Sequence, residues 1–187
     1  MSNIVTVTPE ELGEKNIIYL QRLSTPLGEM YAGASDEGLC LLEFIERRML
    51  KTECTDLRKR LKAEFVDADN VHIQQVREEL DEYFDGRRKI FTVPLHTPGT
   101  NFQQQVWEAL KLVAYGSTMS YSALAEVMGN VRSVRAAANA VGQNRIGIII
   151  PCHRIIGKDG SLTGYGGGLH RKRALLDLEA DHEAEGR

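Results

Sequence analysis

Cysteine is scarce in this chain, and its spacing does not suit a disulfide framework. The 187 residues contain Cys40, Cys54 and Cys152, an odd number with wide separations. No CxxC pair and no HExxH motif is present, and although His72 and His96 lie upstream of Cys152, they lack the paired spacing of a structural zinc site. The cysteine content therefore excludes a disulfide-rich secreted scaffold and fits a reducing compartment.

The sequence also lacks a long apolar run. No stretch approaches the roughly 18 apolar residues that a membrane-spanning helix needs, and the polar opening MSNIVTVTPEELGEK has no signal-peptide layout. With 42% hydrophobic and 26% charged residues, the composition is that of an ordinary globular protein. We therefore expect an intracellular protein with no membrane partner, cytoplasmic or, in a eukaryote, nuclear.

The net charge is small, but it is unevenly distributed. Residues 1–128 carry a net charge of −6, residues 129–176 carry +7 with Asp159 as the one acidic residue, and residues 177–187 carry −4. Such a basic segment is expected of a surface that contacts phosphates, although a solvated basic face explains it equally well.

The first half has the pattern of a small α/β unit. Residues 15–46 alternate apolar stretches with the turn signals TPLG and SDEG, which predicts two or three antiparallel strands. Residues 46–64 and 72–85 have helical spacing, and KIFTVPL at 89–95 predicts a further strand. We place this domain at 1–95 and a linker, rich in turn formers, at 96–101.

The second half, residues 102–187, is predicted to be mostly helical. FQQQVWEALKLV has an apolar stripe of helical spacing. SYSALAEVMG and SVRAAANAVGQ follow, separated by a short turn, and this arrangement predicts a helix-turn-helix in which each helix begins at a serine. The alanine-rich second helix has little side-chain bulk, so another backbone can approach it closely. The fold class is thus α/β, with an α/β domain followed by a mostly helical one.

Cys152 lies in IIIPCHRIIG, after a run that is typical of a buried strand. His153 and Arg154 bring positive charge beside the sulfur, which favours the thiolate and therefore a nucleophile. In an extended segment His153 would point away from Cys152, so a turn or a water must connect them. A histidine base also needs an acidic partner, for which Asp159, Asp177, Glu179 and Asp181 are candidates. The six glycines between 157 and 168 indicate either a flexible linker or a loop that approaches a ligand.

From about Phe102 to Glu179 the chain resembles the O6-alkylguanine-DNA alkyltransferases, which transfer an alkyl group from damaged guanine to their own cysteine. The resemblance rests on FQQQVWEAL, SYSALAEVMGN, VRSVRAAANAVGQN, IIIPCHRII and GYGGGLHRKRALLDLE, in this order. It implies a stoichiometric methyltransferase that acts once and needs no cofactor. The N-terminal half resembles the family only in size and α/β character.

The resemblance also implies roles for individual residues. Cys152 would accept the alkyl group, His153 would take its proton through a water, Glu179 would hold the histidine, and Asn144 would brace the turn that presents the thiol. Tyr121 would protonate the departing guanine and contact the DNA backbone. Further residues would bind DNA, with Arg135 filling the gap left by the flipped base, or would line the guanine pocket: Arg135, Ser133, Ala136 and Ala138; Tyr165, Gly166, Gly167, Val141 and Ile155.

The implied partner is double-stranded DNA that contains O6-alkylguanine, bound through the minor groove with low sequence specificity. Flipping the nucleotide out of the stack costs a few kcal/mol. We expect a monomer in solution that can cluster along DNA. The glycines beside Tyr165 leave little bulk at the pocket lip, which predicts tolerance of alkyl groups larger than methyl. Some relatives bind zinc upstream, but Ser35 and Cys40 stand at two of those ligand positions, so we expect no zinc here.

Three alternatives have different consequences. A damage-recognising DNA-binding protein without transfer would not need Cys152. A transcriptional regulator that uses alkylation as its signal would be expected to carry a sensor domain, which this sequence does not show. A cysteine hydrolase built on Cys152 and His153 would turn over repeatedly and would need an oxyanion hole.

Overall fold

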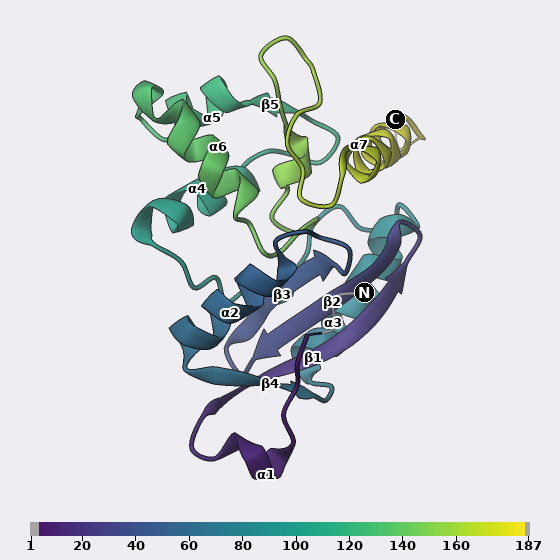
Figure 1. The fold of residues 1–187 in the computed structure, drawn as a ribbon. Helices are drawn as coiled ribbons and strands as arrows, with labels where there is room; N and C mark the ends of the chain where they lie inside the picture. Colours follow the sequence, from purple (N-terminus) through teal and green to yellow (C-terminus); the bar gives the residue numbers. More distant parts are fainter. Residues whose placement is uncertain (1–3, 186–187) are drawn as a thin grey trace. The chain divides into compact units, whose positions relative to one another are not determined.

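The computed structural model describes residues 4–185, and these divide between Pro98 and Gly99 into two compact units, unit 1 (residues 4–98) and unit 2 (residues 99–185) (Figure 1). No helix in the described part of the chain is long and apolar enough to cross a membrane. A short helix, α1 (Pro9–Leu12), precedes the sheet of unit 1.

Unit 1 is built on a four-stranded sheet in the order β3-β2-β1-β4. Strands β1 (Asn16–Thr25), β2 (Gly28–Ser35) and β3 (Gly38–Phe44) are antiparallel, as the turn signals predict, and β4 (Ala63–Asp67) pairs in parallel with β1. The sequence prediction missed β4: its first two residues were included at the end of the helical segment 46–64, and the remaining three were assigned to no element.

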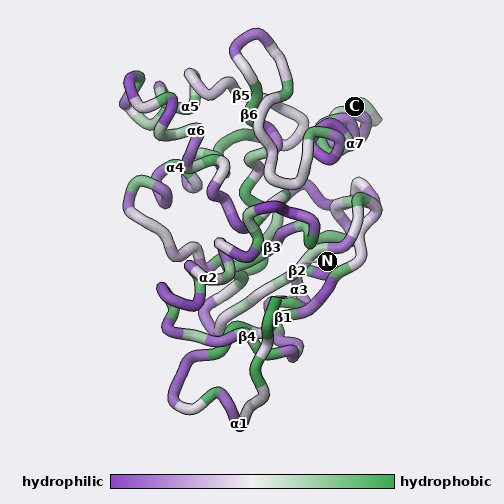
Figure 2. The backbone as a smooth tube through the Cα atoms, in the orientation of Figure 1, coloured by the Kyte–Doolittle hydropathy of each residue, from purple (hydrophilic) through white to green (hydrophobic). Residues whose placement is uncertain are grey.

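Helices cover the sheet of unit 1. Helix α2 (Leu50–Leu61) packs its buried side chains into a cluster with Ile18, Leu20 and Phe65, and Figure 2 shows the hydrophobic stretches along the strands. Helix α3 (Val71–Phe84), which Asn70 caps through its side chain, contacts strands β1, β2 and β3. Because helices and loops bury both faces, every residue of β3 is buried.

The strand predicted at 89–95 is wrong. Residues 89–95 form a loop, and only Leu95 makes an isolated bridge, with Leu39. The close approach depends on Gly38, whose φ is +148° and where a Cβ would lie 2.5 Å from the carbonyl oxygen of Pro94. Only glycine fits there, so this loop is fastened to the hairpin turn by backbone contacts.

Unit 2 contains the predicted helices. They are α4 (Asn101–Lys111), α5 (Tyr121–Val127), α6 (Val134–Gly142) and α7 (Leu169–Glu185), with a 3₁₀ turn, η1 (Val131–Ser133), before α6. Helices α5 and α6 form the helix-turn-helix. Ser120 caps α5 by accepting from the backbone of Ala123, but Ser133 makes no such cap and instead donates to Asn130.

A two-residue parallel ladder connects the helix-turn-helix to the segment that follows Cys152. Strand β5 (Met119–Ser120) pairs with β6 (Ile155–Ile156). Figure 1 shows β5 beside the long loop that leads to α7. Tyr121 follows β5 directly, and Cys152 lies three residues before β6, so this ladder fixes the two residues in relation to each other.

Candidate active site around Cys152

The isoleucine run before Cys152 is a tight turn. Residues 147–150 have turn geometry, and Ile148 has a φ of +69°, which is a strained conformation for a β-branched residue. The strand-like prediction for this run is therefore wrong. The side chains of Ile146, Ile148 and Ile150 are nevertheless buried, so their hydrophobicity serves packing and not strand pairing.

Asn144 holds this turn. Its side-chain amide donates to the carbonyl of Ile150 at 2.8 Å and to the sulfur of Cys152 at 3.2 Å, and its oxygen accepts from the backbone of Ile146 at 3.0 Å. Asn144 is 1% exposed and Cys152 is 6% exposed, so the amide orders a nearly closed environment around the thiol. An amide donor to sulfur also favours the thiolate.

Cys152, His153 and Arg154 form a single 3₁₀ turn, η2, instead of an extended segment. The expectation that Cys152 and His153 point to opposite sides of a strand therefore does not apply. Of the four acidic candidates, the structure places Glu179 against the histidine: His153 Nε2 lies 2.8 Å from Glu179 Oε1. Both side chains are fully buried.

Glu179 is ionised despite its burial. Burial opposes ionisation, but hydrogen bonds from His153 and Arg154 outweigh that cost and lower the pKa of Glu179 to about 2. Arg154 donates from Nε and Nη2 at 2.9 Å, and the backbone of Gly116 donates to Glu179 at 3.1 Å. A third donation, from Arg154 Nη1 to the carbonyl of Val113 at 2.6 Å, anchors the guanidinium.

The carboxylate of Glu179, paired with Arg154, determines which ring nitrogen of His153 carries the proton. A carboxylate only accepts, so His153 must carry its proton on Nε2 and leave a lone pair on Nδ1. Burial lowers the pKa of His153, which favours the neutral ring, although Glu179 acts in the opposite direction. The Nδ1 atom is buried and makes no hydrogen bond to the described residues. His153 is therefore a neutral base.

Two basic residues of α7 hold the glycine-rich loop in place. The ammonium group of Lys172 donates to the carbonyls of Ile155 at 2.5 Å and Thr163 at 2.7 Å, and Arg171 donates to the carbonyl of Gly167 at 3.0 Å. Burial lowers the pKa of Lys172, and ionisation of Cys152 acts in the opposite direction. Sequence reasoning missed this function of Lys172 and Arg171, although a helix that follows six glycines is a natural anchor for such a loop.

The residues expected to line a guanine pocket differ in exposure. Tyr165 is half-buried, Gly166 is exposed and Gly167 is buried, whereas Val141 and Ile155 belong to the buried core of unit 2. Ile155 pairs with Met119 in the two-stranded ladder. Tyr121 is half-buried, and the charge of Cys152 acts on its hydroxyl, so the phenol and the thiol share one electrostatic environment.

The expected DNA-binding residues lie on or near α6. Arg135 and Ala136 are exposed, Ser133 and Ala138 are partly exposed, and the neighbouring Ala137 is buried. The alanines of this helix thus lie on two faces. Ala137 and Ala140 pack against the core, where Trp107 Nε1 donates to the carbonyl of Ala140 at 3.0 Å. Only the outer face is open to another molecule.

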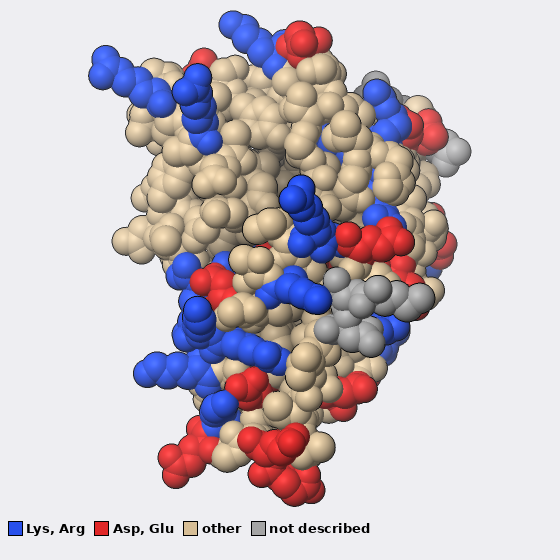
Figure 3. Space-filling model, in the orientation of Figure 1, with Lys and Arg blue, Asp and Glu red and all other residues tan. Residues whose placement is uncertain are grey.

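Half of the basic residues in segment 129–176 are buried. The exposed four extend from α6, its preceding turn, the loop tip and the start of α7, and in Figure 3 Lys and Arg side chains project over α5, α6 and the loop. They are Arg132, Arg135, Lys158 and Arg173; the buried four are Arg145, Arg154, Arg171 and Lys172. The positive charge of this segment therefore overstates the charge that can meet phosphates.

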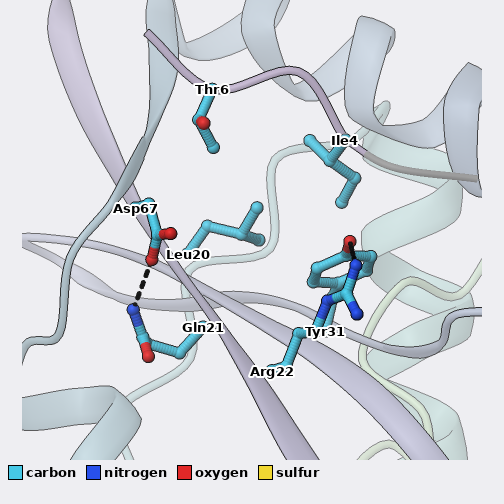
Figure 4. A pocket seen from close by; sticks show the side chains of 7 residues that line it. All are labelled: Ile4, Thr6, Leu20, Gln21, Arg22, Tyr31 and Asp67. Carbon is cyan, nitrogen blue, oxygen red and sulfur yellow. Dashed lines mark hydrogen bonds between the residues drawn. The ribbon is translucent and has the colours of Figure 1, made fainter. Parts of the chain in front are cut away.

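Two cavities of unit 1 are lined by residues other than cysteine. One, of about 370 Å³, is shown in Figure 4: Arg22 stacks on Tyr31, Gln21 donates to Asp67, and Ile4 and Thr6 lie on the opposite wall. The other, of about 520 Å³, is lined by ten residues, including Ser35 and His96. The first has paired polar groups and no nucleophile, so it offers no chemistry like that of Cys152.

Ser35 and Cys40, the two positions that the resemblance relates to zinc binding, each make a hydrogen bond within unit 1. Ser35 Oγ lies 2.8 Å from His96 Nδ1, and Cys40 Sγ donates to the carbonyl of Gly33 at 3.4 Å. Among residues 4–185, no group of three or more His, Cys, Asp or Glu side chains is arranged to hold a metal ion.

Comparison with known proteins identifies this arrangement. Residues 101–181 match the DNA-binding domain of 6-O-methylguanine DNA methyltransferase, and residues 18–97 match the ribonuclease-like domain of the same family. The inducible methylated-DNA–protein-cysteine methyltransferase of Bacillus subtilis is 44% identical over 68% of this chain and 72% of its own length. The enzyme of the same name from Methanosarcina barkeri is 34% identical over 88% of this chain and 99% of its own.

Solved structures agree with the sequence comparison. The crystal structure of Mycobacterium tuberculosis OGT in complex with DNA has a TM-score of 0.75 and 36% identity, and it covers 88% of this chain and 94% of that one. The M. tuberculosis O6-methylguanine methyltransferase structure has a TM-score of 0.74 with the same coverage. The chain therefore belongs to the 6-O-methylguanine DNA methyltransferase family.

Proposed function

We propose that Cys152 is the residue that accepts the alkyl group, and that its substrate is O6-alkylguanine in duplex DNA. As a member of this family, the chain is a DNA-repair methyltransferase that binds DNA and transfers the alkyl group to a cysteine of its own. Two buried contacts of adjacent residues support the assignment: Asn144 donates to the Cys152 sulfur, and His153 bonds to Glu179. Cys40 and Cys54 lie in the core of unit 1 and have no comparable surroundings.

Thiol activation is the first step. His153 has its lone pair on Nδ1, and we propose that a water passes the Cys152 proton to this atom. The imidazolium that forms is stabilised by Glu179, which is already ionised, so the positive charge develops beside a carboxylate. Asn144 and Lys172 stabilise the sulfur anion, one by a hydrogen bond and the other by its charge.

Transfer then exchanges one bond for another. The sulfur lone pair attacks the alkyl carbon, the S–C bond forms, and the bond between carbon and O6 breaks with its electron pair left on guanine. Tyr121 gives its proton to the departing base, which leaves as neutral guanine. The thioether does not hydrolyse readily, so each protein molecule acts once.

Access to the thiol requires a flipped nucleotide, since the target atom lies within the base stack. We propose that α6 enters the minor groove with Ala136 and Ala138 facing the DNA, and that Arg135 occupies the space of the flipped base. Tyr165, Gly166 and Gly167 would form one side of the guanine pocket, above Val141 and Ile155. Recognition in the minor groove tolerates many sequences, which suits a repair protein.

The relatives from B. subtilis and M. barkeri favour this function over the alternatives of a binding protein, a regulator and a hydrolase, since both are named methyltransferases. We expect the protein to work as a monomer that can cluster on DNA, in the cytoplasm or, in a eukaryote, the nucleus. For the domain boundaries we propose an N-terminal domain at 1–95, a linker at 96–101 and an acceptor domain at 102–187.

Intact-protein mass spectrometry after incubation with a duplex containing O6-methylguanine tests the proposal. We expect one methyl group per chain, on Cys152, and none on the Cys152→Ala variant. Cys54→Ala, which removes another buried thiol, serves as the control and keeps the mass gain. Binding without a gain in mass, repeated turnover, or methylation of the Cys152→Ala protein would each contradict the proposal.

A further inference from the structure

The hydroxyl of Tyr121 lies where three segments of unit 2 meet. Tyr121 begins α5 immediately after β5, and β5 is hydrogen-bonded to β6, three residues beyond Cys152. The third segment is the end of the glycine-rich loop: a Cβ placed on Gly164 would lie 3.6 Å from Tyr121 Oη. The loop backbone therefore approaches the phenol oxygen closely.

Thr163, the residue before Gly164, hydrogen-bonds to Tyr121 through its side chain. Its position is fixed from the other side, because Lys172 donates to the carbonyl of Thr163 at 2.7 Å and to that of Ile155 at 2.5 Å. Ile155 pairs with Met119 in the ladder that leads into Tyr121. The contacts thus close a ring from Tyr121 through Thr163, Lys172 and the ladder back to Tyr121.

These contacts bear on the acidity of the Tyr121 phenol. Burial raises the pKa of Tyr121, and the negative charge of Cys152 raises it further, so two effects make the phenol a weaker acid. The hydrogen bond from Thr163 acts in the opposite direction and favours the phenolate. A hydroxyl that donates to the phenol oxygen also leaves the Tyr121 proton free to point elsewhere.

We propose that Thr163 is a positioning residue for proton transfer to the leaving guanine: its hydroxyl donates to Tyr121 Oη, directs the phenol proton at the departing base and stabilises the phenolate that remains. The inference rests on the proposed function. In the step, Tyr121 loses its O–H proton to guanine as the bond between O6 and the alkyl carbon breaks, and the S–C bond forms on Cys152.

The test compares two reactions of the same thiol. The methyl group of an O6-methylguanine duplex leaves behind a base that needs a proton, whereas iodoacetamide releases iodide, which needs none. We expect Thr163→Val to slow methyl transfer by about 10- to 100-fold, the size of a lost hydrogen bond to a developing charge. The rate with iodoacetamide should stay unchanged, and Thr163→Ser should restore methyl transfer.

Two controls separate positioning from damage to the loop. Ser161→Ala removes a hydroxyl of the same loop that bonds to Asp159 at 2.6 Å, and it should leave both rates unchanged. In a Tyr121→Phe background, Thr163→Val should add no further loss, because the group on which it acts is gone. Thr163 is exposed, so its replacement is compatible with folding.

Several outcomes would overturn the inference. They are equal slowing of both reactions, additive losses in the double variant, failure of Thr163→Ser to restore the rate, or an unchanged methyl-transfer rate in Thr163→Val. Failure of the proposed function has a different signature, since the wild-type protein would then gain no methyl mass from the duplex at all.

Discussion

In unit 1 the buried Arg47 lies between two carboxylates, whereas in unit 2 the buried Arg154 shares one carboxylate with a histidine. Arg47 donates to Glu53 at 2.9 Å and approaches Glu43 at 3.3 Å. Arg154 and His153 both bond to Glu179. Arg47 carries one positive charge and cannot neutralise two buried carboxylates. In unit 2 the charge of Glu179 is already balanced by Arg154, so His153 stays neutral. The first arrangement retains a proton on a carboxyl group, and the second provides a base next to a thiol.

The difference shows what makes a buried charge functional. Burial raises the pKa of Glu43 to about 8, with Arg47 opposing this and Glu53 adding to it. Cys54 follows Glu53 in α2 but belongs to the apolar core cluster of unit 1, and the charged groups that act on Glu43 are Arg47 and Glu53. In unit 2 the pair is adjacent in sequence to the nucleophile.

Removing a carboxylate from each cluster should separate the two clusters in both stability and methyl-transfer rate. Glu179→Ala leaves the buried Arg154 without its carboxylate, so it should lose about 3–5 kcal/mol of unfolding free energy in urea titrations. Glu53→Ala should lose less, because Arg47 keeps Glu43 as a partner at 3.3 Å. Only Glu179→Ala should slow methyl transfer, by at least about 100-fold, because His153 loses the group that fixes its proton. Rates are measured on folded protein, well below the unfolding midpoint. An equally slow Glu53→Ala would abolish the distinction between the clusters.

The two clusters should also respond differently to pH. The folded protein keeps a proton on Glu43 that the unfolded chain releases near 4.5, so this residue makes stability fall between about 4.5 and about 8. Glu179 has a lowered pKa, so its contribution is present above 4.5 and is lost as the pH falls towards about 2. Glu43→Gln should therefore raise stability at pH 8.5 by a few kcal/mol and barely change it at pH 4.5, as urea titrations at both values would show. If Glu43→Gln loses as much stability between pH 4.5 and pH 8.5 as the wild-type protein, Glu43 is not the residue responsible.

Because half of the Lys and Arg residues in segment 129–176 are buried, we expect a modest salt dependence of DNA binding. Four exposed basic residues in segment 129–176 support a slope of log K against log salt of about −3.6 at most from this segment, at about 0.9 per phosphate contact. Arg132→Gln, at the exposed turn before α6, should reduce the slope by about 1. Arg171→Gln, its buried counterpart, should leave the slope unchanged. Fluorescence anisotropy at several salt concentrations measures both, and equal effects would show that Arg171 meets the DNA.

The smallest expected effect concerns the size of the alkyl group. Gly166 and Gly167 provide no side chains at the proposed pocket lip, so duplexes with O6-methylguanine and O6-butylguanine should react at comparable rates, within about tenfold, which is a barrier difference of about 1.4 kcal/mol. Gly166→Leu should slow the butyl reaction selectively. A rate several hundredfold lower for butyl in the wild-type protein would show that another part of the pocket limits its size.

Sequence patterns correctly predicted the elements that depend on short-range interactions, such as turns, helical spacing and helix caps. The antiparallel hairpins follow from TPLG and SDEG, and α3, α4 and the helix-turn-helix follow from helical spacing and the cap at Ser120. Prediction failed where long-range contacts decided the backbone. The residues KIFTVPL have strand-like composition, but Leu95 makes only one bridge; the run before Cys152 is apolar, yet Asn144 forces it into a turn with Ile148 at positive φ.

The site itself was only partly accessible from the sequence. From the residues alone, His153 had four acidic candidates, and only the resemblance singled out Glu179; the bond between His153 and Glu179 joins residues that are 26 positions apart. Lys172 and Arg171 counted as surface charge until the structure showed their bonds to loop carbonyls. Charge can be read from a sequence, but whether a charged side chain faces solvent or a carbonyl depends on packing.

The parallel ladder between β5 and β6 also determines where the chain tolerates insertion. An insertion between Gly116 and Ser120 would displace Met119 from Ile155 and move the phenol away from the sulfur. The tip at Lys158–Gly160 is exposed and lies outside the ladder. A short peptide tag placed at this tip would leave the pairing intact, which makes the tip the position of choice for attaching a reporter to the acceptor unit.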